Sequence, residues 1–259
     1  MKIICIDGFN SYLANNFYNK YKKKYKIVKF KSDINNISEL INFILKKKVT
    51  IYIRFAGLSR SNCKIHSKKC YSTNFIANQQ LVNFIKLKKI KLIFMSSSHI
   101  YSHSNRKINE KFNAIPNSNY GRFKLKSENY IKKYLDDYLI MRIFNIYGKD
   151  QPAGYFFSDM IEKIRNKKKI TINNSYRDFI HVNEVSRFIN FALNKKLNGI
   201  FNVGSGKSYK LSSIIKMISE KMKIKPNLLI KKKIDKLVSD NTIIKNKGFI
   251  VKNEKNLSY

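Results

Sequence analysis

A tyrosine and a lysine four residues apart, Tyr120 and Lys124, are the side chains whose types and spacing best suit chemistry. On a helix both would share one face, and an ammonium group beside a phenol favours the phenolate, which makes the tyrosine a usable acid or base near neutral pH. Ser97 follows an apolar stretch that we expect to be a strand, and a hydroxyl there could bond a substrate oxygen. The same spacing also arises by chance in a lysine-rich chain, so the pair alone does not decide the function.

The first expected strand runs into a turn with small residues at a three-residue spacing, Gly8, Ser11 and Ala14. A dinucleotide-binding turn needs small residues so that the chain can turn, approach a pyrophosphate and pack its helix on the sheet. The predicted cofactor contacts of this turn are Gly8, Ser11, Tyr12 and Leu13. Only one of the three small residues is glycine, so an ordinary strand-to-helix turn is the alternative.

The segment after the second expected strand bears on the choice of cofactor. In NAD-binding proteins an acidic residue about 20 residues beyond the glycines holds a ribose hydroxyl. This chain has Lys31 and Ser32 there, followed by Asp33. Lys31 could accept the 2′-phosphate of NADP and Asp33 could contact the adenine, so both NAD and NADP stay open. The alternative is that Lys31 is one more solvated lysine.

Three cysteines are present, Cys5, Cys63 and Cys70. An odd number of thiols without a secretory signal predicts no disulfide framework. His66 lies between the last two cysteines, but a structural zinc site takes four ligands, usually in two spaced pairs. We therefore expect incidental loop residues and no metal site.

Apolar residues recur in a pattern that alternates strands with helices, which predicts a doubly wound parallel α/β sheet of the Rossmann type. The expected strands are residues 3–6, 25–30, 50–55, 90–95, 138–144, 178–182 and 199–203. The expected helices are residues 11–21, 38–45 with Ser38 as N-cap, 74–87, 120–134, 157–166 and one that ends at Leu193. The tail after Ser239 shows no clear periodicity.

The chain has 259 residues, 43% of them apolar, which suits one large domain or a core with a small lobe. Its formal net charge of +37 would suit nucleic acid or an anionic membrane. The lysines are spread along the whole chain, however, and the abundant residue types are those of A- and T-rich codons, so we interpret the charge as a result of base composition. A basic face that attracts phosphorylated substrates is compatible with this interpretation. No apolar run approaches the ~20 residues of a membrane span and no signal peptide is evident, so we expect a cytoplasmic protein without a nucleic-acid or membrane partner.

Seven stretches resemble, in order, motifs of the extended short-chain dehydrogenase/reductase family, in its NAD-dependent epimerase/dehydratase group, whose members act on nucleotide sugars. They are Phe55-Ala56-Gly57, Asn74, residues 96–101 (SSSHIY), 120–124 (YGRFK), 142–148 (RIFNIYG), 177–182 (RDFIHV) and 199–206 (GIFNVGSG). The resemblance runs from Met1 to about Ser212 and implies a Rossmann-type fold with a small C-terminal substrate lobe.

The resemblance also implies roles for particular residues. Tyr120 would transfer the proton, Lys124 would hold the cofactor ribose and tune the tyrosine, and Ser97 would orient the substrate. Asn145 and Arg177 are implied contacts of a nucleotide-sugar substrate. The implied contacts of NAD or NADP, besides those of the first turn, are Phe55, Ala56, Gly57, Asn74, Tyr120 and Lys124.

From the resemblance we expect residues 1–147, with residues 177–204 returning to them, to form the dinucleotide-binding core. Residues 148–176 and 205–259 are expected to form the substrate-binding lobe. A homodimer is left open.

Four departures from the family pattern lie close to the expected site. Asp7 stands where the family usually has threonine, and Phe123 replaces a small residue of the tyrosine helix. Ser11 and Ala14 replace the second and third glycines of the first turn, which would weaken pyrophosphate binding. A degenerate, non-catalytic member, or a basic binding protein on the same fold, is therefore the alternative to an enzyme.

The residues after Ser97 bear on the reaction. The 4,6-dehydratases of the family carry an Asp-Glu pair there, whereas this chain has Ser98 and His99. Dehydration is thus disfavoured, and an epimerase or a keto-sugar reductase is predicted.

Overall fold

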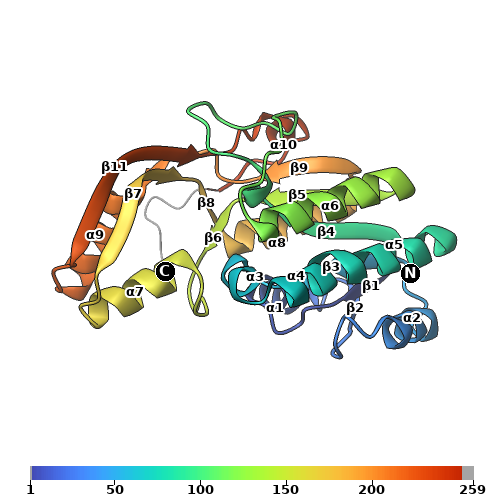
Figure 1. Ribbon diagram of the computed structural model, residues 1–259. Helices are drawn as coiled ribbons and strands as arrows, with labels where there is room; N and C mark the ends of the chain where they lie inside the picture. The colour runs from blue at the N-terminus through green and yellow to red at the C-terminus, as the bar shows by residue number, and fades with distance from the viewer. Residues whose placement is uncertain (1, 253–259) are drawn as a thin grey trace. The chain divides into compact units, whose positions relative to one another are not determined.

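The structure is a computed structural model, and it describes residues 2–252 (Figure 1). Over its described residues the chain forms two compact units. The first comprises residues 2–102, 113–143 and 185–201, and the second comprises residues 103–112, 144–184 and 202–252. The predicted domains stay a prediction about which residues serve the cofactor and which serve the substrate.

A six-stranded sheet forms the centre of the first unit, with the strand order β2-β1-β3-β4-β5-β9. β1 pairs in parallel with β2 and β3, β3 with β4, and β4 with β5. The predicted doubly wound parallel sheet is confirmed. The strands are β1 (Ile3–Ile6), β2 (Lys26–Lys29), β3 (Ile51–Arg54), β4 (Lys91–Ser97), β5 (Tyr138–Ile143) and β9 (Gly199–Val203).

Helices connect these strands and cover the sheet (Figure 1). Successive side chains of a strand point to opposite faces. Cys5, Tyr52 and Phe94 accordingly join one buried cluster with residues of α2, α5 and α6, while α1 and α8 are joined by a hydrogen bond of 2.7 Å from Ser186 Oγ to Asn16 Oδ1. The helices are α1 (Tyr12–Tyr21), α2 (Ile37–Lys46), α5 (Ala77–Lys88), α6 (Asn119–Tyr134) and α8 (Val182–Asn194).

Two local predictions need correction. The N-cap of α2 is Asn36, whose side chain accepts a hydrogen bond from the Glu39 amide, and not Ser38, which lies inside the helix. The helix expected from Asn74 begins as a π-helix, and two short helices precede it where loop residues were expected. These elements are α3 (Arg60–Ile65), α4 (Ser67–Tyr71) and the π-helix η1 (Ser72–Ile76).

The second unit has its own small sheets and its own core. One sheet has the order β10-β7-β11, and β6 pairs in parallel with β8. Apolar faces of α7 and α9 pack with buried aromatic residues such as Phe157 and Phe179. The elements are β6 (Asn145–Tyr147), α7 (Phe156–Arg165), β7 (Ile170–Arg177), β8 (Phe179–His181), β10 (Tyr209–Lys210), α9 (Leu211–Met222), β11 (Leu228–Leu237) and α10 (Thr242–Asn246).

Lysine takes a left-handed backbone conformation just after several helices, a position where glycine is usual. The φ angles of these lysines lie between 50° and 56°. The residues are Lys48, Lys89, Lys167, Lys196 and Lys223.

The carboxylate of Asp178, the residue directly before β8, joins distant parts of the second unit. It is fully buried and accepts hydrogen bonds from the backbone amides of Ser205 (2.8 Å), Gly206 (3.0 Å) and Ser239 (3.1 Å). The hydroxyls of Ser205 and Ser239 donate to it as well. Burial raises the pKa of this carboxyl, against the effect of its donors. The aspartate of the stretch 177–182 is thus a structural centre of its unit.

We expect Asp178→Asn to lower the free energy of unfolding by about 2–4 kcal/mol, because the amide offers one acceptor oxygen and turns its own N–H donors towards backbone donors. Urea denaturation measures this loss. Asp136→Asn, at an exposed carboxylate, is the matched control and should stay within about 0.5 kcal/mol of the wild type. Equal stabilities of the two variants would contradict the role given to Asp178.

Candidate active site

A cavity of about 410 Å³ lies within the first unit, where β1, β2 and β3 end. Six of the predicted cofactor residues line it: Gly8, Ser11, Lys31, Phe55, Ala56 and Gly57. Five further lining residues were not predicted: Phe9, Asn10, Phe30, Ser32 and Ile34. In the sequence, only their position next to a predicted residue or at the end of a strand could have identified them. Tyr12, Leu13 and Asp33 are not among the lining residues.

The turn after β1 depends on a close approach of two backbones. Gly8 has a φ of +56°, and a Cβ atom there would lie 2.6 Å from the Ala56 amide nitrogen. Ser11 donates its amide to the Gly8 carbonyl at 2.7 Å, and its hydroxyl accepts from the Ala14 amide at 3.3 Å as the N-cap of α1. Ala14 is fully buried beneath the turn. The N-terminus of α1 therefore opens towards the cavity, with Ser11 as its cap.

The segment after β2 is held to the π-helix. Asp33 accepts from the amide (2.9 Å) and the side chain (2.8 Å) of Asn35, and these bonds, the backbone one first, lower the pKa of Asp33. Asn35 in turn donates to Thr73 and accepts from Ser72. Lys31 is exposed at the rim of the cavity.

α6 presses the predicted catalytic residues against the end of β4. A Cβ atom on Gly121 would lie 2.2 Å from the His99 carbonyl oxygen, so only glycine allows this packing. The His99 and Tyr120 rings meet edge to face with centroids 6.0 Å apart. Ser97 is buried, and its hydroxyl accepts from the His99 amide at 3.2 Å. The structure therefore brings Tyr120 next to the short turn that follows Ser97.

Lys124 is buried one helical turn after Tyr120. Its ammonium group donates to the Met95 carbonyl at 2.7 Å and lies 5.9 Å from the centre of the Tyr120 ring. Burial, followed by the positive charge of Arg54, lowers the pKa of Lys124 to about 7, against the effects of Asp7 and Glu128. The charge of this lysine thus changes near neutral pH, which sequence reasoning, with a permanent ammonium group, did not anticipate.

Asn74 holds the loop that follows β3. Its side chain accepts from the Leu58 amide at 2.7 Å and donates to the Leu58 carbonyl at 3.1 Å. A Cβ atom on Gly57 would lie 3.0 Å from Asn74 Oδ1 and 3.5 Å from Lys124 Nζ, so the predicted cofactor residues Gly57, Asn74 and Lys124 gather at one place.

A model of the NAD dependent epimerase/dehydratase family matches residues 11–204. The chain belongs to this family. The matched region contains the turn at Ser11, the end of β4 and the whole of α6.

Curated relatives of the chain carry different reactions in their names. It is 24% identical over 227 residues to a dTDP-D-glucose 4,6-dehydratase of Dictyostelium discoideum, a match that covers 79% of this chain and 52% of that protein. It is 25% identical over 171 residues to an uncharacterised UDP-glucose epimerase of Bacillus subtilis strain 168, covering 62% of this chain and 54% of that protein. The matches span about half the length of these relatives.

Solved structures of family enzymes share the fold. The dTDP-glucose 4,6-dehydratase of Bacillus anthracis, in complex with NAD, has a TM-score of 0.87 at 20% identity and covers 100% of this chain and 94% of that one. The UDP-glucose 4-epimerase of Thermus thermophilus, also with NAD, has a TM-score of 0.86 at 16% identity, with 97% and 94% covered. The dTDP-4-dehydrorhamnose reductase of B. anthracis, with NADP, has a TM-score of 0.85 at 21% identity and the same coverage.

A buried ion pair underlies two of the family-like stretches. Arg142, on β5, contacts Glu128 of α6 through Nη2 and Oε2 at 2.7 Å and donates from Nη1 to the Tyr101 hydroxyl at 2.6 Å. Ser96 donates to the same glutamate. The pair thus joins β4, β5 and α6 directly behind Ser97, a structural role that sequence reasoning did not assign.

Two of the three predicted substrate residues, Asn145 and Arg177, belong to the second unit. Asn145 donates its side-chain amide to the Asp178 carbonyl at 2.9 Å. Arg177 forms an ion pair with Asp235. Although burial works the other way, hydrogen bonds from Asn173 and Arg177 bring the pKa of Asp235 down to about 2. Both substrate roles stay predictions.

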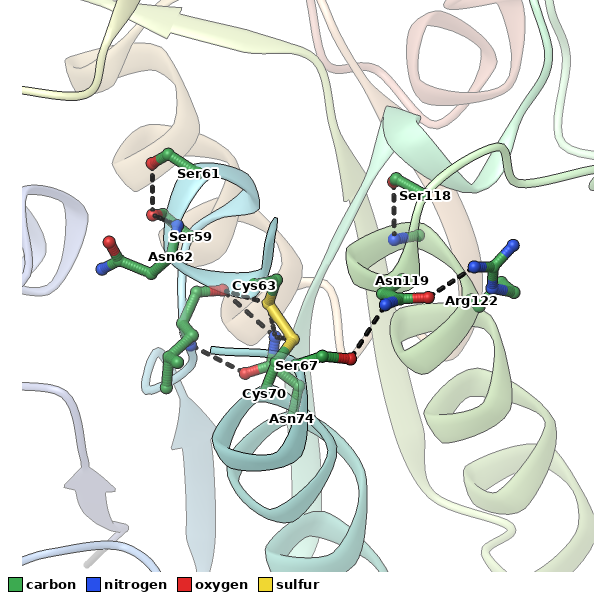
Figure 2. Close-up of a disulfide and its surroundings, with 12 residues drawn as sticks. Ser59, Ser61, Asn62, Cys63, Ser67, Cys70, Asn74, Ser118, Asn119 and Arg122 are labelled. Carbon is green, nitrogen blue, oxygen red and sulfur yellow. Dashed lines mark hydrogen bonds between the residues drawn. A yellow bond between two sulfur atoms is a disulfide. The ribbon is translucent and has the colours of Figure 1, made fainter. Parts of the chain in front are cut away.

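The expectation that the chain has no disulfide is wrong. Cys63 and Cys70 are bonded to each other, with Cα atoms 5.0 Å apart (Figure 2). Cys5 is a free, buried thiol. Counting thiols failed because α3 and α4 fold back on each other at His66 and bring the two cysteines within bonding range. Asn74 Nδ2 lies 3.4 Å and 3.5 Å from the two sulfur atoms, so the disulfide adjoins the residue that holds Leu58.

Residues 2–252 contain neither a metal-binding cluster nor a helix that could span a membrane. No three His, Cys, Asp or Glu side chains gather there so as to hold a metal ion. No helix there has the length and apolar character needed to cross a membrane.

We expect the unfolded, unreduced protein to expose one reactive thiol, that of Cys5, and three after treatment with a dithiol. The disulfide closes a short loop, so we expect the double variant Cys63→Ser, Cys70→Ser to lower the free energy of unfolding by about 2 kcal/mol. Thiol titration in denaturant and thermal unfolding measure the two effects, with Cys5→Ser as the control that keeps the bridge. Three reactive thiols without reduction would contradict the disulfide.

Proposed function

We propose that the chain is an NAD(P)-dependent enzyme that epimerises or reduces a nucleotide sugar. The observation that carries the proposal is the packing of Tyr120 against the turn after Ser97, with buried Lys124 beneath its ring, in a unit that also holds a cavity at its strand ends. Family membership and the names of the relatives, which include epimerases and a reductase, support the substrate class.

The residues around the cavity fit a dinucleotide. Gly8 leaves a bare backbone where a Cβ atom would collide, which lets a pyrophosphate approach, and the N-terminus of α1 offers amide donors to an anion. Lys31 at the rim could meet a 2′-phosphate, and Asp33 could meet the adenine side. Gly57, Asn74 and Lys124 would hold the nicotinamide half. When bound there, the cofactor supplies or accepts the hydride.

Side chains of this protein carry out the proton transfer. In the proposed mechanism Tyr120 passes a proton to or from the substrate oxygen, and Ser97 bonds the same oxygen to fix its direction. Lys124 stabilises the phenolate while it is charged and bonds the cofactor ribose. Arg177 and Asn145 would contact the nucleotide side, and for Arg177 this means exchanging or sharing its partner Asp235.

Epimerisation and keto-sugar reduction both need only the hydride and the tyrosine proton. Dehydration needs a further acid and base, and Ser98 and His99 occupy the positions that follow Ser97. This pattern favours an epimerase or a reductase, although one relative is named as a dehydratase. A cofactor-binding protein without chemistry is the competing possibility, and the two experiments below separate it from an enzyme.

Binding of NADH or NADPH is the first test. The chain contains no tryptophan, so the fluorescence of the reduced cofactor can be followed without interference. We expect saturable binding with either cofactor. Without any binding the proposed function fails, and a steep loss of nucleic-acid binding with salt would instead favour a basic binding protein.

Tyr120→Phe should lower turnover about 10²- to 10⁴-fold on a nucleotide sugar that the wild type converts, because it removes the proton path and keeps the packing. The cofactor should still bind. Tyr134→Phe, at the last residue of the same helix, is the matched control and should turn over like the wild type. Near-normal turnover by Tyr120→Phe would defeat the mechanism.

A further inference from the structure

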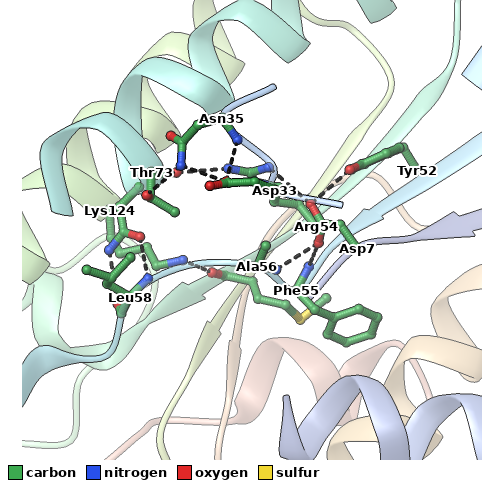
Figure 3. Close-up of polar contacts among 12 residues, drawn as sticks. Asp7, Asp33, Asn35, Tyr52, Arg54, Phe55, Ala56, Leu58, Thr73 and Lys124 are labelled. Atoms are coloured by element: carbon green, nitrogen blue, oxygen red, sulfur yellow. Dashed lines mark hydrogen bonds and ion pairs between the residues drawn. The ribbon is translucent and has the colours of Figure 1, made fainter. Parts of the chain in front are cut away.

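A charged pair lies beneath the cavity, at the ends of β1 and β3. Asp7 and Arg54 are each 1% exposed, with Arg54 Nη1 3.0 Å from Asp7 Oδ2 (Figure 3). The hydroxyl of buried Tyr52 donates to the same carboxylate oxygen at 2.8 Å. Burying two charges is expensive and often adds no stability over apolar residues. The pair therefore calls for an explanation other than stability.

The first part of the explanation is the backbone that the pair holds. Asp7 Oδ1 accepts from the amides of Phe55 (2.6 Å) and Ala56 (2.7 Å), two residues that line the cavity. Arg54 Nη2 donates to the Thr73 carbonyl at 2.8 Å, directly before Asn74. One ion pair thus joins the end of β1, the end of β3 and the π-helix, as Figure 3 shows.

The second part of the explanation is the effect of the two charges on Lys124. Asp7 holds the Ala56 amide, and a Cβ atom on the next residue, Gly57, would lie 3.5 Å from Lys124 Nζ. At this place Arg54 disfavours the ammonium form of the lysine and Asp7 favours it. On its own helix, Glu128 favours the ammonium form and the Tyr120 ring lies 5.9 Å away. Lys124 donates to a backbone carbonyl and packs on the Phe94 ring, 4.7 Å from its centre. The two charges of the pair therefore act on the lysine in opposite directions.

We propose that Asp7 and Arg54 are positioning residues: together they fix the backbone that receives the cofactor and set the charge state of Lys124. This inference rests on the proposed function, because Lys124 matters to the reaction only through Tyr120 and the cofactor. It explains why a carboxylate and a guanidinium group are kept in a place from which water is excluded.

The decisive experiment follows Lys124 by heteronuclear NMR of lysine side chains across pH, without cofactor. Its resonance is identified by its absence in Lys124→Met. Arg54→Met should raise the titration midpoint by about one pH unit, because it removes a like charge, and Asp7→Asn should lower it by a similar amount, because it removes an opposite charge. A merely structural pair would not shift the midpoint in opposite directions.

Two controls accompany the single variants. Tyr52→Phe removes one hydrogen bond to Asp7 without changing any charge, so it should leave the midpoint in place even where it lowers stability. Arg54→Lys keeps the positive charge and should return the midpoint towards that of the wild type. Midpoints that move together, or that do not move in either single variant, would overturn the proposal.

Asp7→Asn with Arg54→Met removes both charges and keeps the proposal testable if a single variant does not fold. The double variant should fold and bind NADH or NADPH about tenfold more weakly, because Phe55 and Ala56 lose their carboxylate acceptor. Wild-type affinity in a folded double variant would overturn the positioning role. A wild type that binds neither cofactor would refute the proposed function instead, and the NMR midpoints would still report on the pair.

Discussion

The carboxylate of Asp7 is the group on which the structure around the cavity of the first unit depends. It receives two backbone amides, a tyrosine hydroxyl and a guanidinium group, so that each oxygen has two donors in a region closed to solvent. A buried carboxylate without its donors is very unfavourable, so β3 cannot move away from β1 without a large loss. The close approach of Gly8 to Ala56 follows from the same constraint, since the amide that Gly8 nearly touches is one that Asp7 holds.

The contacts around Asp7 are connected to those around Tyr120 and Lys124. Arg54 carries the connection to the π-helix, where Asn74 holds Leu58 and lies against the disulfide. On the other side of the strand ends, Glu128 and Arg142 fasten α6 to β4 and β5, and Gly121 lets the helix approach the His99 carbonyl. Lys124 lies between these two groups of buried charges. The position of Lys124 beside Tyr120 thus depends on several buried charged residues.

The fold could be predicted because alternating apolar strands and helices leave few arrangements other than a doubly wound sheet. The Tyr120 and Lys124 pair was visible because helical spacing places both on one face. The partner of Asp7 was not visible, since Arg54 is 47 residues away and looks like any other basic residue until the fold buries it. The disulfide and the near-neutral pKa of Lys124 were missed for the same reason: both depend on which segments meet in space.

The lysines that end five helices in left-handed conformation give the basic composition a different meaning. A β-carbon is strained there and glycine is not, so each such lysine gives up part of the stability that the fold could have. Lysine is encoded by A-rich codons and glycine by G-rich ones. We interpret these lysines, like the rest of the basic composition, as a result of base composition, and they lie at helix ends outside the cavity.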